Sequence, residues 1–205
     1  AIIKEQKGWP FHLLTEDIEF SIHHIIQSKK IAYCEKAMLF DEQPIKFSQS
    51  IHQRLRWSKG YLQVFGVYGK KLFTNALKGS FSCFDMFMNS MPAFILSTIS
   101  IIVNVALAIN AAIIGNDYMI ALKSIAQFLL GMYSTLFVLG LVTTITEWKN
   151  IYAGHQKKIL YLFTFPVFMF TYIPISIAAL FLNVSWKPIE HGTYRKEVGE
   201  LMKNA

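Results

Sequence analysis

The chain has 205 residues, of which 53% are hydrophobic and only 16% are charged, and its formal net charge is +7 at pH 7. Soluble domains usually carry about 25% charged residues, so this composition argues against a uniformly soluble protein. The charges are also unevenly distributed, because residues 93–146 contain only Lys123 and Asp117. The sequence therefore predicts a polar N-terminal part followed by a membrane part.

The positive charge has two interpretations, nucleic-acid binding or contact with anionic lipid headgroups and phosphorylated ligands. The adjoining apolar segments favour the second interpretation. Cys34 and Cys83 have no metal-ligand spacing, so we expect reduced structural thiols. Ala1 is no initiator Met and no signal-peptide pattern follows it, so we expect position 1 to lie inside a longer protein.

The first predicted helix covers residues 16–28. Thr15 is a good N-cap residue, and the acidic residues that follow it suit the positive end of the helix dipole. Residues 31–40 are shorter and less periodic, and we predict a strand there, followed by a turn at residues 41–44. The apolar residues that recur at helical spacing in the first helix are Ile18, Ile22, Ile25 and Ile26.

Residues 48–77 again follow a helical pattern, with apolar residues on one face and most basic residues off it. This pattern is typical of an amphipathic helix in the membrane interface. Three glycines predict interruptions of this helix instead of one continuous rod. The apolar residues are Ile51, Leu55, Leu62, Phe65 and Leu72, and the glycines are Gly60, Gly66 and Gly69.

Two uncharged runs, residues 93–114 and 124–146, are long enough to cross a bilayer as helices. A loop with three lysines, 147–158, separates them from a third apolar segment, 159–182, that two prolines interrupt. Lys and Arg before, between and after these segments favour the cytoplasmic side. We therefore predict two full transmembrane helices and a Pro-broken re-entrant or interfacial segment. Three transmembrane helices are the alternative.

The acidic triplet Thr15-Glu16-Asp17 is the first candidate for chemistry. Sugar transfer with inversion needs a carboxylate that takes the proton of the attacking hydroxyl. Carboxylates at a helix N-terminus are stabilised in their ionised form. The alternative is a purely structural role in capping the helix.

The second candidate is Gln53-Arg54-Leu55-Arg56-Trp57. Gln53, Arg56 and Trp57 are spaced so that they share one helical face. An indole offers a flat apolar platform for a sugar ring, a guanidinium binds phosphate oxygens, and an amide recognises hydroxyls. The alternative is an interfacial helix whose Trp and Arg lie at the headgroup level.

The order of triplet, Gln-x-x-Arg-Trp motif and apolar segments resembles the C-terminal half of the membrane-embedded processive family 2 glycosyltransferases. These include cellulose, chitin, hyaluronan and poly-N-acetylglucosamine synthases. Gly8-Trp9-Pro10 and Asp41-Glu42-Gln43-Pro44 fit this resemblance, which covers essentially the whole chain. It implies a hexosyltransferase that transfers sugar from a nucleotide sugar, such as a UDP-sugar, to a growing polysaccharide and passes the polymer through the membrane.

The resemblance also implies roles for individual residues. Asp17 is expected to be the general base, and Glu16 to shape the site. Trp57 is expected to stack on the terminal sugar, and Arg56 to contact the donor diphosphate. The other residues assigned to substrate binding are Thr15, Gln53 and Arg54. The loop expected to close over the bound nucleotide contains Trp186, Lys187 and His191. The Lys-Pro-Ile-Glu of this loop differs from better-known versions.

The family's metal-binding Asp-x-Asp motif does not occur in this sequence. The resemblance therefore places the donor-binding half, with the ligands of Mg²⁺ or Mn²⁺, upstream, and the isolated chain is expected to be inactive. The predicted regions are a remnant of a GT-A-like α/β catalytic domain on the acceptor side (1–47), interface helices (48–92), a transmembrane region (93–182) and a cytoplasmic tail (183–205).

The expected partners are the nucleotide sugar, the polysaccharide, the bilayer and the missing N-terminal half, with no nucleic acid. The expected location is the plasma membrane, with the catalytic side facing the cytoplasm. Two other functions stay open at this point. One is a transferase that adds a single sugar to a lipid, and the other is a non-enzymatic membrane scaffold subunit.

Overall fold

The computed structural model describes residues 2–34, 37, 39, 41, 43–90, 92–115 and 118–186. These residues form α-helices joined by turns and irregular segments. The chain divides into two compact units, which are described separately below. Unit 1 comprises Ala1–Met91 and Ile175–Ala205, and unit 2 comprises Pro92–Pro174.

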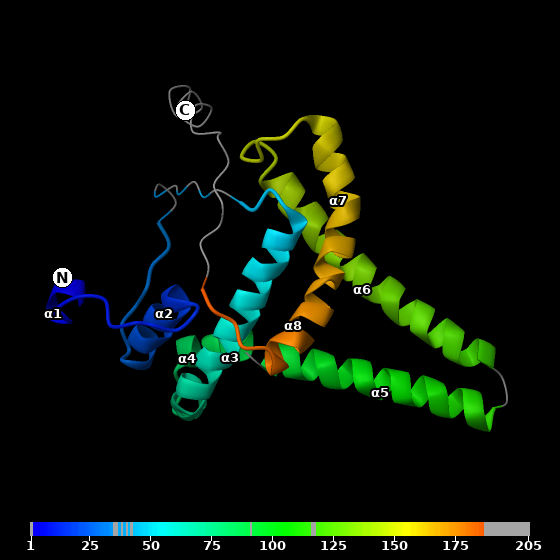
Figure 1. The fold of residues 1–205 in the computed structure, drawn as a ribbon, viewed down its shortest axis with the longest axis horizontal. Helices are drawn as coiled ribbons and strands as arrows, with labels where there is room; N and C mark the ends of the chain where they lie inside the picture. Colours follow the sequence, from blue (N-terminus) through cyan, green and yellow to red (C-terminus); the bar gives the residue numbers. More distant parts are fainter. Residues whose placement is uncertain are drawn as a thin grey trace. The chain divides into compact units, whose positions relative to one another are not determined.

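Unit 1 is built around the long helix α3 (Phe47–Leu77), against which α2 (Glu16–Ile26) and α4 (Phe81–Ser90) pack. The short helix α1 (Ile2–Glu5) precedes them, and Figure 1 shows α2 and α4 beside α3. The predicted helix over residues 16–28 is confirmed by α2. The core of this unit comprises Ile22, Ile25, Val64, Leu72 and Cys83.

Helix α3 is continuous over 31 residues, so the interruptions predicted from its glycines are wrong. A helical glycine costs about 1 kcal/mol relative to alanine, but burial of one face of α3 against α2 and α4 offsets that cost. Gly60 and Gly69 are buried in unit 1, whereas Gly66 faces open space. A sharp turn follows the helix at Gly79, whose φ of +94° favours glycine.

The strand predicted over residues 31–40 is absent from the described part of that segment. Residues 31–34, 37 and 39 have neither helical nor strand structure, and their side chains are exposed. A strand needs a neighbour that satisfies its backbone N–H and C=O groups. The described residues therefore show a helical protein and do not support the expected GT-A-like α/β segment.

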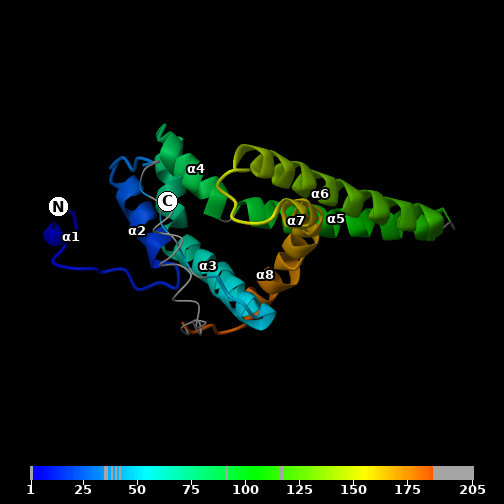
Figure 2. The ribbon, with the colours of Figure 1, turned by 90° about the horizontal axis from the view of Figure 1, so that it is seen from above.

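Unit 2 contains three antiparallel helices, of which α5 (Pro92–Ile114) and α6 (Tyr118–Thr146) form a hairpin. Figure 2 shows these two helices lying side by side. Helix α7 (His155–Phe170) then packs against α6. The Tyr133 hydroxyl donates to the Phe163 carbonyl oxygen at 3.0 Å, and Gly140 lets the Phe165 side chain approach the α6 backbone.

Two helical stretches among the described residues are long and apolar enough to cross a membrane, Ala121–Thr146 and His155–Phe181. Their large apolar side chains are exposed, with Leu130 at 65% and Ile145 at 65%. Water penalises such a surface, whereas lipid does not. Helix α5 occupies the other predicted span, and the apolar stretch recognised in it is the shorter Ile99–Ile114.

The Pro-interrupted segment is more helical than the sequence predicts. Pro166 lies inside α7 and Pro174 inside α8 (Tyr172–Phe181), and Thr171 separates the two helices. The stretch has the length that the alternative of three transmembrane helices requires. The division between the units falls inside α8, and its second half belongs to unit 1.

Candidate functional site

The N-terminus of α2 lies directly against the middle of α3, and Gly60 forms the contact. A Cβ placed on Gly60 would be 2.4 Å from Thr15 Cγ2 and 2.6 Å from Thr15 Oγ1. Beside this contact, the Leu14 backbone N–H donates to Gln63 Oε1 at 3.2 Å. Thr15 is only 4% exposed. The start of the acidic triplet is therefore fixed to α3, although 45 residues separate it from Gly60.

This contact belongs to the helical face that carries the second motif. Gly60 follows Trp57 by three residues, Arg56 by four and Gln53 by seven, and residues at these spacings share one face of a helix. All three side chains are partly exposed. The structure thus brings Thr15 to one end of the face formed by Gln53, Arg56 and Trp57.

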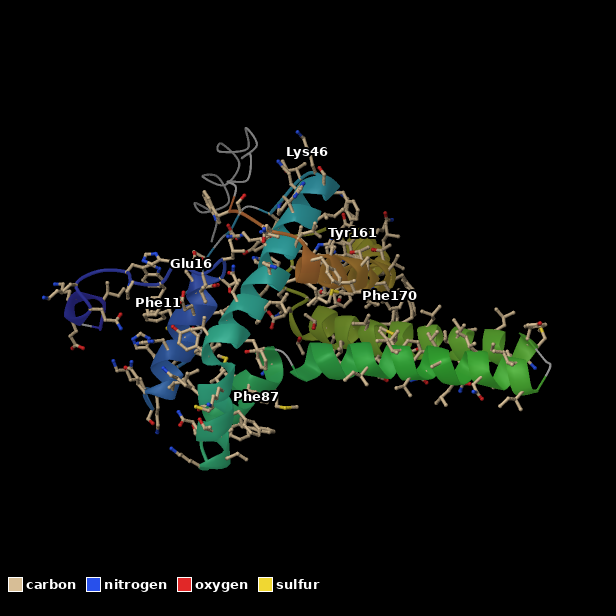
Figure 3. All side chains as sticks on the ribbon, turned by 60° about the horizontal axis from the view of Figure 1, so that its bottom comes forward. Phe11, Glu16, Lys46, Phe87, Tyr161 and Phe170 are labelled. Carbon is tan, nitrogen blue, oxygen red and sulfur yellow. The ribbon has the colours of Figure 1, made fainter. Side chains whose placement is uncertain are left out.

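Glu16 and Asp17 occupy the first turn of α2, and both side chains are exposed. Figure 3 labels Glu16 at this end of the helix. The Ile18 backbone N–H donates to Asp17 Oδ1 at 2.8 Å. Both carboxylates therefore lie on the solvent-exposed side of this turn. An exposed, oriented carboxylate of this kind is suited to accept a proton.

Thr15 occupies the N-cap position of α2 but makes no side-chain cap hydrogen bond. Glu19 organises this end of the helix instead. Its Oε2 accepts from the backbone N–H groups of His12, at 3.1 Å, and Leu13, at 3.0 Å. Its Oε1 accepts from the Tyr68 hydroxyl at 3.2 Å, which ties the loop before the triplet to α3.

Glu19 is a residue whose role sequence reasoning missed. An acidic residue in a first helical turn predicts a favourable interaction with the helix dipole. Its position in the sequence does not predict hydrogen bonds to the preceding loop. Burial raises the pKa of the Tyr68 hydroxyl, and the nearby Glu19 carboxylate raises it further. Tyr68 therefore stays protonated and remains a donor to Glu19.

Arg54 differs from the rest of its motif, because its side chain is only 1% exposed. Its Nε donates to the Ser50 carbonyl oxygen at 3.2 Å, and its guanidinium carbon lies 5.7 Å from the centre of the Phe47 ring. Both partners belong to the first turn of α3. These contacts hold Arg54 against the start of α3, off the face that carries Gln53, Arg56 and Trp57, and substrate binding by Arg54 stays a prediction.

An aromatic group supports the loop that precedes the triplet. Trp9 stacks on Phe20 with 5.1 Å between ring centres, and Phe11 packs edge-on against the same ring at 5.5 Å. Phe11 is labelled beside α2 in Figure 3. Burial in this group lowers the pKa of His23, and the neighbouring His24 lowers it further. Gly8-Trp9-Pro10 therefore packs against α2.

The second half of α8 contacts α3 on another side. The Ser58 and Ser176 hydroxyl oxygens are 3.4 Å apart, and Lys59 Nζ donates to the Ala179 carbonyl oxygen at 3.1 Å. A cation near the last carbonyls of a helix is favourable. The chain then continues to Trp186, which is 60% exposed. The other two residues predicted for the closing loop, Lys187 and His191, lie outside the described residues.

The described side chains contain no group of three His, Cys, Asp or Glu residues placed to hold a metal ion. No family model, curated protein or solved structure matches the chain. A functional assignment thus depends on the motifs and on the geometry that joins them.

Proposed function

We propose that this chain is the acceptor side of a membrane-bound, inverting and processive glycosyltransferase that extends a polysaccharide from a nucleotide sugar. The contact between Thr15 and Gly60 is the observation that carries the proposal. It joins an acidic triplet to a helical face with an indole, a guanidinium and an amide. Proton removal, sugar stacking and phosphate binding need these groups.

In this mechanism, Asp17 takes the proton of the acceptor hydroxyl while that oxygen attacks the anomeric carbon of the donor sugar. The bond from this carbon to the diphosphate breaks as the new glycosidic bond forms. Arg56 is suited to interact with the departing diphosphate, because a guanidinium donates to two phosphate oxygens at once. Trp57 holds the terminal sugar of the polymer by stacking, Gln53 binds hydroxyl groups, and Glu16 shapes the site.

The membrane part fits an enzyme that passes its product through the bilayer. Two apolar stretches have the length to cross, and the basic α3 precedes them. The positive-inside rule supports a cytoplasmic position of α3 and the site, and the plasma membrane is the location that we propose. The ligands of Mg²⁺ or Mn²⁺ would come from a donor-binding half.

The test uses the full-length protein in membranes, with labelled UDP-sugars supplied one at a time in the presence of Mg²⁺ or Mn²⁺. We expect high-molecular-weight product from one donor. Asp17→Asn should lower the rate about 10²-fold to 10⁴-fold, as loss of a general base does, and Trp57→Ala should shorten or abolish the polymer. Asp85→Asn is the matched control, because Asp85 is an exposed acid on α4 whose side chain accepts from Asn89.

Each outcome assigns the function differently. Polymer synthesis that Asp17→Asn leaves intact would remove Asp17 from its role. A short lipid-linked product would identify a single-sugar transferase. No incorporation from any donor by correctly inserted protein would favour a scaffold subunit and overturn the proposal.

A further inference from the structure

We propose that Gly60 is a positioning residue, which sets the distance between the acidic triplet and the face formed by Gln53, Arg56 and Trp57. The catalytic meaning of this distance rests on the proposed function. The distance itself is a property of unit 1 and is testable without any assay of sugar transfer.

The absence of a Cβ at Gly60 is what allows the close approach. Besides the short distances to Cγ2 and Oγ1 of Thr15, the added Cβ would lie 3.0 Å from Thr15 Cβ. Thr15 cannot yield by rotating its side chain alone, because its β-branched Cβ is itself in contact and Oγ1 and Cγ2 both point at α3. An alanine at position 60 must therefore move the backbone of Thr15.

The three glycines of α3 differ in what an added Cβ would contact. Nothing lies within 4 Å of a Cβ on Gly66, so alanine fits there without any movement. A Cβ on Gly69 would meet the Phe65 ring of the same helix at 3.1 Å, which leaves the position of α2 untouched. Alanine is also the better helix former at all three positions. Only at Gly60 does glycine serve a neighbouring element.

A movement of Thr15 is transmitted to the carboxylates that follow it. Asp17 is two residues away on the same rigid first turn of α2, whereas Arg56 and Trp57 stay on α3. A misplacement of about 1 Å between reacting groups can cost about 10²-fold in rate. In Gly60→Ala we therefore expect kcat to fall by about 10-fold to 10²-fold, while KM for the nucleotide sugar stays nearly constant.

The experiment compares four full-length proteins in nanodiscs: wild type, Gly60→Ala, Gly66→Ala and the double variant Gly60→Ala with Thr15→Ala. Thr15→Ala removes Cγ2 and Oγ1 and so restores room for the new methyl group. Thr15→Ala alone completes the double-mutant cycle. Gly66→Ala makes the same chemical change on the same helix and should leave kcat unchanged.

A second readout measures the contact directly. Leu14→Cys and Gln63→Cys place two thiols at the hydrogen-bonded pair beside Gly60, in a Cys34→Ser background where the remaining Cys83 is buried. A short thiol cross-linker should join them in wild type and in Gly66→Ala. Gly60→Ala should cross-link several-fold more slowly, and the double variant should recover the wild-type cross-linking rate.

Two results would overturn the inference. One is a cross-linking rate in Gly60→Ala equal to that of Gly66→Ala. The other is slower cross-linking with an unchanged kcat, because the distance would then have no bearing on the reaction. A wild type that makes no product from any donor would refute the proposed function alone, since the cross-link still reports whether Gly60 sets the distance.

Discussion

At the start of α2, the N-cap residue Thr15 makes no side-chain cap hydrogen bond, and Glu19 bonds to the loop before the helix instead. Glu19 satisfies the backbone of the preceding loop, whereas Thr15 buries a hydroxyl with no hydrogen-bond partner among the described residues. Burial of an unpaired hydroxyl costs free energy, about 1–3 kcal/mol in mutational data. The shape of Thr15 therefore matters for packing on Gly60, and its polarity does not contribute to stability.

Thr15→Val tests this interpretation, because valine keeps the shape and replaces the hydroxyl by a methyl group. We expect the free energy of unfolding of unit 1 to rise by about 1 kcal/mol, measured by thermal denaturation in nanodiscs. Thr74→Val is the control, since the Thr74 hydroxyl donates to the carbonyl oxygens of Lys70 and Lys71. Loss of stability in Thr15→Val would show that the hydroxyl has a partner.

The sequence predicts the candidate residues but not the contact that joins them. The spacing of Gln53, Arg56 and Trp57 is a local property, and so is the position of Thr15 before an amphipathic helix. The meeting of Thr15 with Gly60 is a long-range contact, and a lone glycine in a helical pattern carries no sign of what approaches it. The sequence alone predicts that Gly60 weakens the helix, whereas the structure shows it as a packing position.

Among the elements, the amphipathic helices α2 and α3 can be predicted from the sequence, whereas the strand at residues 31–40 cannot. The apolar residues of α2 and of α3 recur at the period of a helix, because each helix buries one face. This pattern is visible within each segment of the sequence. A strand is stabilised by pairing across distance, so a run of apolar and β-branched residues cannot show whether a partner exists. Residues 31–34 have the composition of a strand without a described neighbour.

The packing of α6 on α7 offers a test at this scale. A Cβ on Gly140 would lie 3.0 Å from Phe165 Cδ1 and 3.3 Å from Leu162 Cδ1, whereas one on Gly131 would meet nothing. Small residues let membrane helices approach closely. Gly140→Ala should therefore lower the free energy of unfolding of unit 2 by about 1 kcal/mol, which thermal denaturation detects as a lower midpoint. Gly131→Ala should leave the midpoint unchanged. Equal midpoints would mean that α7 shifts at no cost.

For the whole molecule, the balance of charge and apolar length predicts a membrane protein, and the two long apolar helices agree with it. The number of crossings is a harder question, because length and charge disagree for His155–Phe181. Its length permits a full crossing, whereas its second half is held to α3 through Ser176 and Ala179. The lysines and arginines on both sides of this stretch favour a segment that returns to the side from which it started.

Cysteine accessibility decides between the two arrangements. We expect Lys149→Cys and Ser185→Cys, in a Cys34→Ser background, to react with an impermeant maleimide from the same, cytoplasmic side. Tyr118→Cys, at the exposed start of α6, should react from the opposite side and serves as the control. Labelling of Ser185→Cys from the side of Tyr118→Cys would establish three transmembrane helices.

The two native cysteines of unit 1 differ in accessibility, so their reaction rates can report local opening of this unit. Cys34 is exposed, whereas Cys83 is 1% exposed in the core, with its Sγ 3.9 Å from the Ile25 carbonyl oxygen. A thiol reagent should modify one sulfur per molecule at once and the second only when α2 and α4 separate from α3. The rate of the slow phase then measures how often α2 and α4 open away from α3 beneath the candidate site. This measurement works in native membranes and needs no substrate.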